Sequence, residues 1–208
     1  MDKRIQNILR ILRRLYPEAS TALRHKNPLQ LLVSTILSAQ CTDLRVNQVT
    51  PGLFRRYRTA RAFATADRGE LEGMIRSTGF FRTKARSILE AFRKIDELHG
   101  GKVPRTMEEL TRLRGVGRKT ANVVLGSGFG KNDGVVVDTH VGRISRRLGL
   151  TKANDPVKVE RDLMKTIPRK TWTVFSHQLI WHGRNVCKAI HPRCRECALA
   201  PFCPSADL

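Results

Sequence analysis

The chain has 208 residues, 40% of them hydrophobic, so it is long enough for one large domain or two smaller lobes. Lysine and arginine number 39 against 18 acidic residues, which gives a formal net charge of +21. So large a surplus repels itself, and it predicts a polyanionic partner rather than a basic surface that binds nothing. A membrane is disfavoured as the partner, because no isolated basic segment lies beside an apolar anchor.

No stretch reaches the roughly 18 apolar residues that cross a bilayer. The amphipathic start, MDKRIQNILRILRRLY, lacks the hydrophobic region and cleavage site of a secretory signal. Its basic residues leave a transit peptide as an alternative, which the core-like spacing of its apolar residues disfavours. We expect a cytosolic protein, in which clustered cysteines indicate a metal site rather than disulfides.

Most of the chain predicts helices, because apolar residues recur three and four positions apart. The first helix is expected between Ile5 and Tyr16. Asn27 and Pro28 are typical of an N-cap and a first helical residue. They open the stretch LQLLVSTILSAQ, which is apolar on most sides and predicts a central core helix. Cys41 is expected to be a buried small hydrophobic residue of this helix.

Further helices follow in chain order. They are predicted at about 44–54, 71–75, 85–98, 106–113, 118–125, 141–148, 156–167 and 172–183. Thr106 and Glu109 have the spacing of a capping box. Only 135–137 looks extended, which is too short to predict a sheet. The glycine-rich stretch GSGFGKNDG at 126–134 is the expected hinge between two helical lobes.

The stretch LRGVGRKTANVVLG predicts a tight turn between two helices. Gly115 and Gly117 permit the turn and leave backbone N–H groups uncovered, an arrangement that binds phosphate without reading sequence. Arg112, Arg114 and Arg118 add positive charge. The alternative is a plain helix-turn-helix corner with glycines for close packing, and the net charge favours the phosphate site.

Lys119 occupies an unusual place for a cation, since the N-terminus of a helix repels positive charge. That position, the neighbouring arginines and partial burial would all disfavour its charged form. A neutral amine can attack an electrophilic carbon and form a Schiff base. A phosphate-binding lysine would suit the same location, so the residues alone leave both roles open.

Asp138 lies in VVVDTHVGR, where it is expected to cap the following helix. Capping would fix the carboxylate at an edge of the inter-lobe cleft, where it could stabilise positive charge developing on a sugar. The same carboxylate would favour the charged form of a nearby ammonium. The two groups therefore need separation, or a bound substrate, for both roles to hold.

Four cysteines near the end of the chain have the spacing Cys187-x6-Cys194-x2-Cys197-x5-Cys203. Four thiolates so close together in a helical chain predict either zinc or an iron–sulfur cluster. Zinc sites usually use two short cysteine pairs, and only Cys194 and Cys197 form one here. The spacing leaves the choice of metal open.

These features, in this order, resemble the endonuclease III family, bifunctional DNA glycosylases of the helix-hairpin-helix superfamily. The matching stretches are LLVSTILSAQCTD, STGFFRTKA, GVGRKTANVVLG, VVVDTHVGR and the four-cysteine tail, so the resemblance covers essentially the whole chain. It implies an all-α fold of two helical lobes with a DNA cleft between them. One lobe would be a six-helix barrel over 21–131 with its helix-hairpin-helix at about 106–126. The other would combine 1–20 with 132–208 and hold a cluster loop at 187–203.

The resemblance also implies the chemistry. Relatives excise oxidised pyrimidines, such as thymine glycol, from double-stranded DNA and cut the abasic strand on its 3′ side by β-elimination. Lys119 matches the Schiff-base nucleophile and Asp138 the catalytic carboxylate. The four cysteines match the ligands of a [4Fe-4S] cluster. We expect a monomer in the bacterial cytoplasm, associated with the nucleoid.

Eight further residues are implied to contact DNA, and the two that depart from the usual family pattern bear on specificity. They are Gln40, Phe80, Arg114, Gly115, Val116, Gly117, Arg118 and His140. Gln40 matches the residue that fills the gap left by the flipped nucleotide. Phe80 replaces a leucine wedge and Arg114 a proline, so opposite-base preference and kinetics are expected to differ from those of relatives.

Two rival functions are weaker. The mismatch adenine glycosylase shares the expected fold and cluster, but it lacks the hairpin lysine and carries a further C-terminal domain. This chain has Lys119 and continues only five residues past Cys203. A non-catalytic iron–sulfur DNA-binding protein would explain the charge, hairpin and cysteines, but would leave Lys119 and Asp138 without a role.

Overall fold

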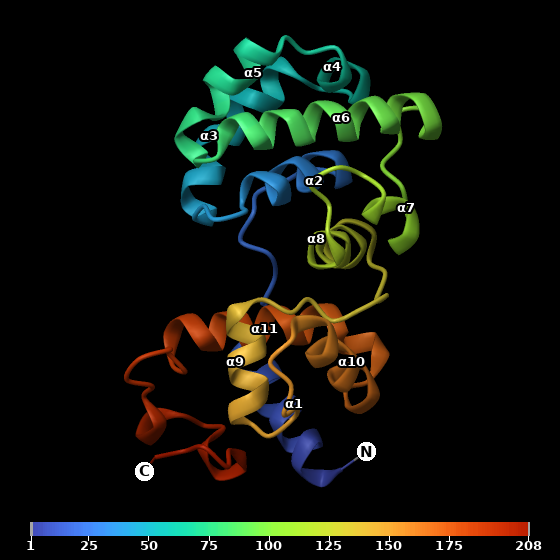
Figure 1. The fold of residues 1–208 in the computed structure, drawn as a ribbon. Coiled ribbons are helices and arrows are strands. Elements are labelled where there is room, and N and C mark those ends of the chain that lie inside the picture. The colour runs from blue at the N-terminus through green and yellow to red at the C-terminus, as the bar shows by residue number, and fades with distance from the viewer. Residues whose placement is uncertain (1, 208) are drawn as a thin grey trace. The chain divides into compact units, whose positions relative to one another are not determined.

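The computed structural model describes residues 2–207, which are helical with no β-strand among them (Figure 1). This confirms the predicted all-α class. The chain divides into two compact units. The central unit is Thr21–Lys131, and the terminal unit is the described part of Met1–Ser20 and Asn132–Leu208. No helix of the described residues is both long and apolar enough to cross a membrane.

The central unit is built around α2 and the long helix α6. Its helices are α2 (Pro28–Leu37), α3 (Asp43–Arg56), α4 (Ala60–Ala64), α5 (Arg68–Ile75), α6 (Phe81–His99), α7 (Met107–Thr111) and α8 (Arg118–Val123). A 3₁₀ turn, η1 (Arg76–Thr78), precedes α6, and a π-helical segment, η2 (Val124–Gly128), extends α8. Phe63 of α4 stacks on Phe92 of α6 with ring centroids 4.8 Å apart. The sequence pattern did not indicate α4, whose five residues are too few for a helical period.

The start of α2 confirms the prediction from Asn27 and Pro28. The Asn27 side chain accepts a 3.0 Å hydrogen bond from the backbone N–H of Gln30. The helix is buried from Leu31 to Leu37, as expected for a core helix. It ends there, however, because the backbone turns through a left-handed conformation at Gln40 (φ 50°). Cys41 therefore lies in a turn and is half-buried, so its expected place inside the core helix is wrong.

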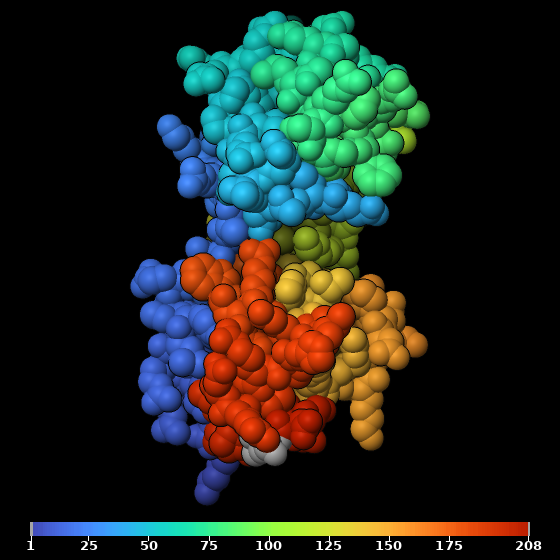
Figure 2. All heavy atoms as spheres, turned by 90° about the vertical axis from the view of Figure 1, so that its left-hand side faces the viewer, coloured from blue at the N-terminus to red at the C-terminus, as the bar shows by residue number. Residues whose placement is uncertain are grey.

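The terminal unit has its own core. Its helices are α1 (Lys3–Leu15), α9 (Thr139–Arg147), α10 (Pro156–Thr166) and α11 (Trp172–Asn185), followed by the 3₁₀ turns η4 (Cys194–Glu196) and η5 (Ala200–Phe202); η3 (Arg169–Thr171) precedes α11. Ile8 and Leu12 of α1 are fully buried against Phe175 and Leu179 of α11 in one apolar cluster. Figure 2 shows the orange and red residues of α11 and the C-terminal segment beside the blue residues of α1.

The stretch 135–137 is buried but forms no strand. The backbone N–H of Val136 donates instead to the hydroxyl of Ser176 on α11 at 3.0 Å. A buried amide must be paired somewhere, and this side-chain acceptor replaces a sheet partner. The extended segment thereby leads the chain to Asp138 at the start of α9.

Candidate functional site

The hairpin between α7 and α8 is a close-packed turn. Thr106 caps α7, since its hydroxyl accepts the Glu109 N–H at 3.3 Å, which confirms the capping expectation. Gly115 has a φ of +76°, a conformation that side chains rarely adopt. A Cβ atom there would lie 2.7 Å from the Cβ of Ser87 on α6. The hairpin therefore requires glycine at position 115 for two reasons: the backbone conformation is left-handed, and the neighbouring helix leaves no room for a side chain.

The start of α8 exposes backbone amides. Gly117 is its N-cap residue, in an extended conformation, and no side-chain hydrogen bond caps the helix. The first amides of a helix have no partner within it, so those of α8 are open to a ligand. Val116 is only 4% exposed because its side chain joins the core. It can therefore meet DNA through its backbone alone.

The charge around the hairpin is more balanced than the sequence suggests. Arg112 pairs with Glu108, and Arg114 approaches Glu90 at 3.4 Å. Lys119 is exposed in the free chain, so the expected partial burial is wrong. It is the second residue after the Gly117 cap, in the first turn of α8.

Three segments of the central unit gather near the C-terminal end of α2. The hairpin reaches it at Ile36, whose Cγ2 would lie 3.9 Å from a Cβ on Gly115. Gln40 follows α2 directly, and Phe80 lies in the turn before α6. Both side chains are exposed, Phe80 by 64%, and both backbones are left-handed, with φ values of 50° and 47°. Strained positions of this kind often present functional side chains.

Lys84 is a residue that the sequence reading missed. It is only 4% exposed, and its Nζ donates a 2.7 Å hydrogen bond to the backbone carbonyl of Thr78, just before Phe80. Burial lowers the pKa of Lys84, while nearby Cys41 opposes that shift. The proximity of Cys41 places the Phe80 turn beside the Gln40 turn. The signal was available, since Lys84 precedes Ile88 by four residues and so shares its buried face.

Asp138 begins α9 in the terminal unit and caps it as expected. Its Oδ1 accepts the Val141 N–H at 2.8 Å. His140 and His177 lie near enough for the carboxylate to raise the pKa of each. Burial outweighs that effect, lowering the pKa of His140 below its usual 6.5 and that of His177 to about 4. Asp138 therefore lies beside two imidazoles that are mostly uncharged at neutral pH.

The ring of His140 is fixed by its neighbours. Its Nδ1 lies 3.3 Å from Nη2 of Arg143, which also donates to the backbone carbonyl of Cys187 at 2.8 Å. Gly183 of α11 leaves room for the ring, because a Cβ there would lie 2.6 Å from His140 Nδ1. This second required glycine was not singled out from the sequence.

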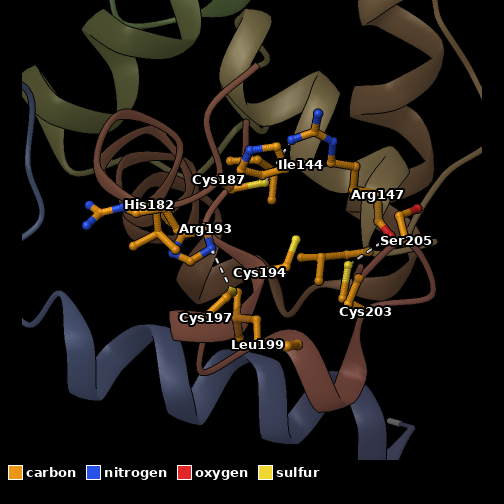
Figure 3. Close-up of a pocket in the computed structure, with 15 residues that line it drawn as sticks. Ile144, Arg147, His182, Cys187, Arg193, Cys194, Cys197, Leu199, Cys203 and Ser205 are labelled. Atoms are coloured by element: carbon orange, nitrogen blue, oxygen red, sulfur yellow. Dashed lines mark hydrogen bonds between the residues drawn. The ribbon is translucent and has the colours of Figure 1, made fainter. Parts of the chain in front are cut away.

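The four C-terminal cysteines line one pocket of the terminal unit (Figure 3). All are free thiols, and apolar side chains such as Ile144, Leu148 and Leu199 form much of the wall. No acidic residue lines the pocket. Among residues 2–207, no three His, Cys, Asp or Glu side chains are arranged to hold one metal ion.

Donors to sulfur surround this pocket. Arg147 Nη1 donates to the Cys187 sulfur at 3.3 Å, and His182 Nε2 lies 3.5 Å from the Cys197 sulfur. Burial raises the pKa of the Cys197 and Cys203 thiols, and the neighbouring cysteines raise it further. Several thiolates in one pocket repel each other, so a cationic centre that replaces their protons fits this donor set.

Comparison with known proteins agrees with this geometry. The model of the HhH-GPD superfamily of base excision DNA repair proteins matches residues 33–169. The fold and the hairpin thus define a base excision DNA repair protein of that superfamily. A solved structure of a trapped endonuclease III–DNA covalent intermediate superposes with a TM-score of 0.92, at 42% identity, over 99% of this chain and 98% of the other.

Sequence relatives narrow the assignment. An endonuclease III of Synechocystis is 60% identical over 99% of this chain and 94% of its own length. One of Bacillus subtilis is 46% identical over 91% and 86%. The chain belongs to the endonuclease III family and is a DNA glycosylase of base excision repair with that family's AP lyase activity.

Proposed function

We propose that the chain removes oxidised pyrimidines, such as thymine glycol, from double-stranded DNA and cuts the abasic strand through a Schiff base on Lys119. The observation that carries this proposal is the position of Lys119, two residues after the uncapped glycine turn. Backbone amides of Gly115, Val116 and Gly117, with Arg114 and Arg118, would hold the phosphates beside the target sugar. The amine would then lie next to the anomeric carbon.

The reaction follows from the chemistry of a neutral amine. The target nucleotide is flipped out of the duplex, which opens C1′ to attack. The Nζ lone pair of Lys119 forms a bond to C1′ as the glycosidic bond breaks. The base departs with the electron pair of the glycosidic bond and takes up a proton, and the new ammonium group loses one. The sugar ring opens to an imine. Loss of a C2′ proton then expels the 3′ phosphate, and water releases the lysine.

The nucleophile needs an unprotonated amine and exclusion of water. Since Lys119 is exposed in the free chain, we infer that contact with DNA, rather than the fold alone, removes water from it. Asp138 uses Oδ1 to cap α9, which leaves Oδ2 to stabilise positive charge on the sugar. His140, held by Arg143, would contact the DNA backbone.

Gln40 and Phe80 are proposed to enter the duplex at the lesion. Gln40 would fill the gap left by the flipped nucleotide, and Phe80 would stack on the unpaired opposite base. Stacking of a base on an aromatic side chain contributes about 1–3 kcal/mol and tolerates every base. We therefore expect weaker opposite-base discrimination than a leucine wedge would give.

Cys187, Cys194, Cys197 and Cys203 are proposed to hold a [4Fe-4S] cluster. Four free thiols in one largely apolar pocket, with Arg147 donating to sulfur, support this assignment. The cluster would cross-link the segment 187–203 that follows α11 rather than act on the substrate. Iron and sulfide analysis of the purified protein tests it, and stoichiometric zinc without iron would contradict it.

We further propose that the chain acts as a monomer on the bacterial nucleoid, in the cytoplasm. A single chain contains the hairpin, Lys119, Asp138 and the cysteine pocket, and chromosomal DNA is its substrate. Sedimentation of the protein at micromolar concentration checks the monomer. A stable dimer would contradict it.

Borohydride trapping tests the mechanism. The protein is incubated with a thymine-glycol duplex and reduced, so that any imine becomes a stable covalent adduct. We expect an adduct with the wild type and with Lys102→Ala, an exposed lysine of the same unit, and none with Lys119→Ala. Equal trapping by Lys119→Ala would overturn the assignment of the nucleophile. A duplex with an oxidised purine, compared under the same conditions, checks the lesion class.

A further inference from the structure

A basic pocket on the central unit plays no part in the reaction described above. It is lined by nine residues, none of them acidic: Arg24, His25, Lys26, Gln30, Thr50, Pro51, Phe54, Arg55 and Arg58. The segment before α2 forms one side, and the C-terminal half of α3 forms the other. Figure 2 shows the blue segment before α2 beside the light-blue residues of α3.

The cations of this pocket are available to a ligand. Arg24, Lys26, Arg55 and Arg58 are exposed, and none forms an ion pair within the described part of the chain. Arg56, next to Arg55, contrasts with them because it pairs with Glu70 at 2.6 Å. Four uncompensated charges around one hollow attract an anion with several charges.

The pocket is held in shape by hydrogen bonds between its two sides. Asn47 of α3 accepts the Arg24 N–H at 2.8 Å and donates to the Ala22 carbonyl at 2.8 Å. The Lys26 N–H donates to the Gln30 side chain at 2.9 Å. These contacts fix the backbone on either side of His25, so little ordering is required when a ligand binds.

The inner wall of the pocket suits a nucleic acid. Thr50 is 2% exposed, and its hydroxyl has no hydrogen-bond partner among residues 2–207. It can therefore donate to a phosphate oxygen. Phe54 is half-buried beside it. Guanidinium groups around a hydroxyl are usual contacts of a phosphodiester backbone.

The pocket is separated from the segments proposed to contact the lesion. The hairpin, Gln40 and Phe80 gather near the C-terminal end of α2, whereas Lys26 and Gln30 lie at its N-terminal end. The ten residues of α2 span about 15 Å. A duplex bound at the lesion site and a ligand in this pocket would therefore occupy different parts of the central unit.

We propose that this pocket is a second DNA-binding site, which takes the phosphodiester backbone of another DNA segment while the first occupies the hairpin. Two duplex segments repel each other, and the four cations offset that repulsion. A chain that binds two segments can pass from one to the other without entering solution. The proposal goes beyond the excision reaction and does not depend on Lys119.

Sedimentation with a short undamaged duplex in excess, of about 12 base pairs and roughly 40 Å long, tests the proposal. We expect the wild type to bind two duplexes per chain and Arg55→Glu with Arg58→Glu to bind one. In the wild type the second binding step should weaken steeply as the salt concentration rises, because the cations of the pocket neutralise phosphates. The control is Arg61→Glu with Lys102→Glu, two exposed cations of the same unit that do not line the pocket. It makes the same charge change and should still bind two.

A second readout is single-turnover excision from a short lesion duplex, which the pocket variant should perform at the wild-type rate. One duplex per wild-type chain, or two per pocket variant, would overturn the proposal. If the control variant also binds only one duplex, the loss of the second duplex results from the change in net charge and not from the pocket, which would overturn the proposal. Slower excision by the pocket variant would show that Arg55 and Arg58 belong to the lesion-binding site, and it would overturn the proposal that the pocket is a separate site.

Discussion

Lys84 Nζ donates a 2.7 Å hydrogen bond to the carbonyl of Thr78 from a side chain that is 4% exposed. That bond ties the first turn of α6 to the residue two positions before Phe80, whose backbone is left-handed. Burying an ammonium group is costly unless it is hydrogen-bonded. We conclude that Lys84 positions the Phe80 turn.

Lys84→Met should loosen that turn. It leaves the Thr78 carbonyl without its partner, which costs about 1–3 kcal/mol, although loss of a buried charge offsets part of this. We expect slower excision and a changed ratio of rates across the four opposite bases. Lys94→Met is the matched control, because Lys94 on the same helix makes an exposed bond to the Arg112 carbonyl at 3.2 Å. Equal opposite-base ratios in both variants would exclude a positioning role.

The two hairpin glycines should respond differently to alanine. Gly115→Ala places a methyl group 2.7 Å from Ser87 and forces a side chain into φ +76°. Together these effects should cost about 2–5 kcal/mol. Gly117→Ala meets nothing within 4 Å and has a φ of −86°, so its effect on unfolding should stay within about 0.5 kcal/mol. Urea denaturation measures the free energy of unfolding of both variants. Similar losses in the two variants would show that the hairpin is not close-packed.

The capping and catalytic roles of Asp138 can be separated. Asp138→Asn keeps a side-chain oxygen for the Val141 N–H, so stability should change little, whereas Asp138→Ala should lose about 1 kcal/mol. Both remove the carboxylate, and both should slow cleavage about 100-fold or more. Thermal unfolding and single-turnover cleavage on one duplex give the two quantities. Wild-type cleavage by Asp138→Asn would exclude a catalytic role.

Acid should destabilise the chain partly through His177. Its pKa is about 4 in the folded state because of burial, against 6.5 for a free imidazole. The unfolded chain therefore binds more protons between those values, so stability is fully present above pH 6.5 and is lost as the pH falls towards 4. The full effect is about 3 kcal/mol.

Denaturation of His177→Gln at several pH values checks this. The variant should lose less stability than the wild type between pH 6.5 and 4. His99→Gln, a half-exposed histidine on α6, is the control and should follow the wild type. An unchanged pH dependence in His177→Gln would mean that another group titrates in that interval.

The sequence by itself determined the helical class, most of the helix starts and the endonuclease III family. Asn27, Thr106 and Asp138 are short polar residues before apolar runs. The side chain of each caps a helix by accepting a hydrogen bond from the backbone N–H three residues further along the chain. Such local signals need no knowledge of the rest of the chain. The cysteine spacing is likewise local. It predicted that the four thiols serve one metal site, and all four line one pocket.

Tertiary structure alone decided what depends on contacts between distant residues. The need for glycine at position 183 beside His140 and the pairing of Arg114 with Glu90 each involve residues far apart in the chain. So does the basic pocket, whose two sides Asn47 connects. The exposure of Lys119 was misjudged for the same reason, because burial is set by which elements pack around a helix, and periodicity does not reveal them.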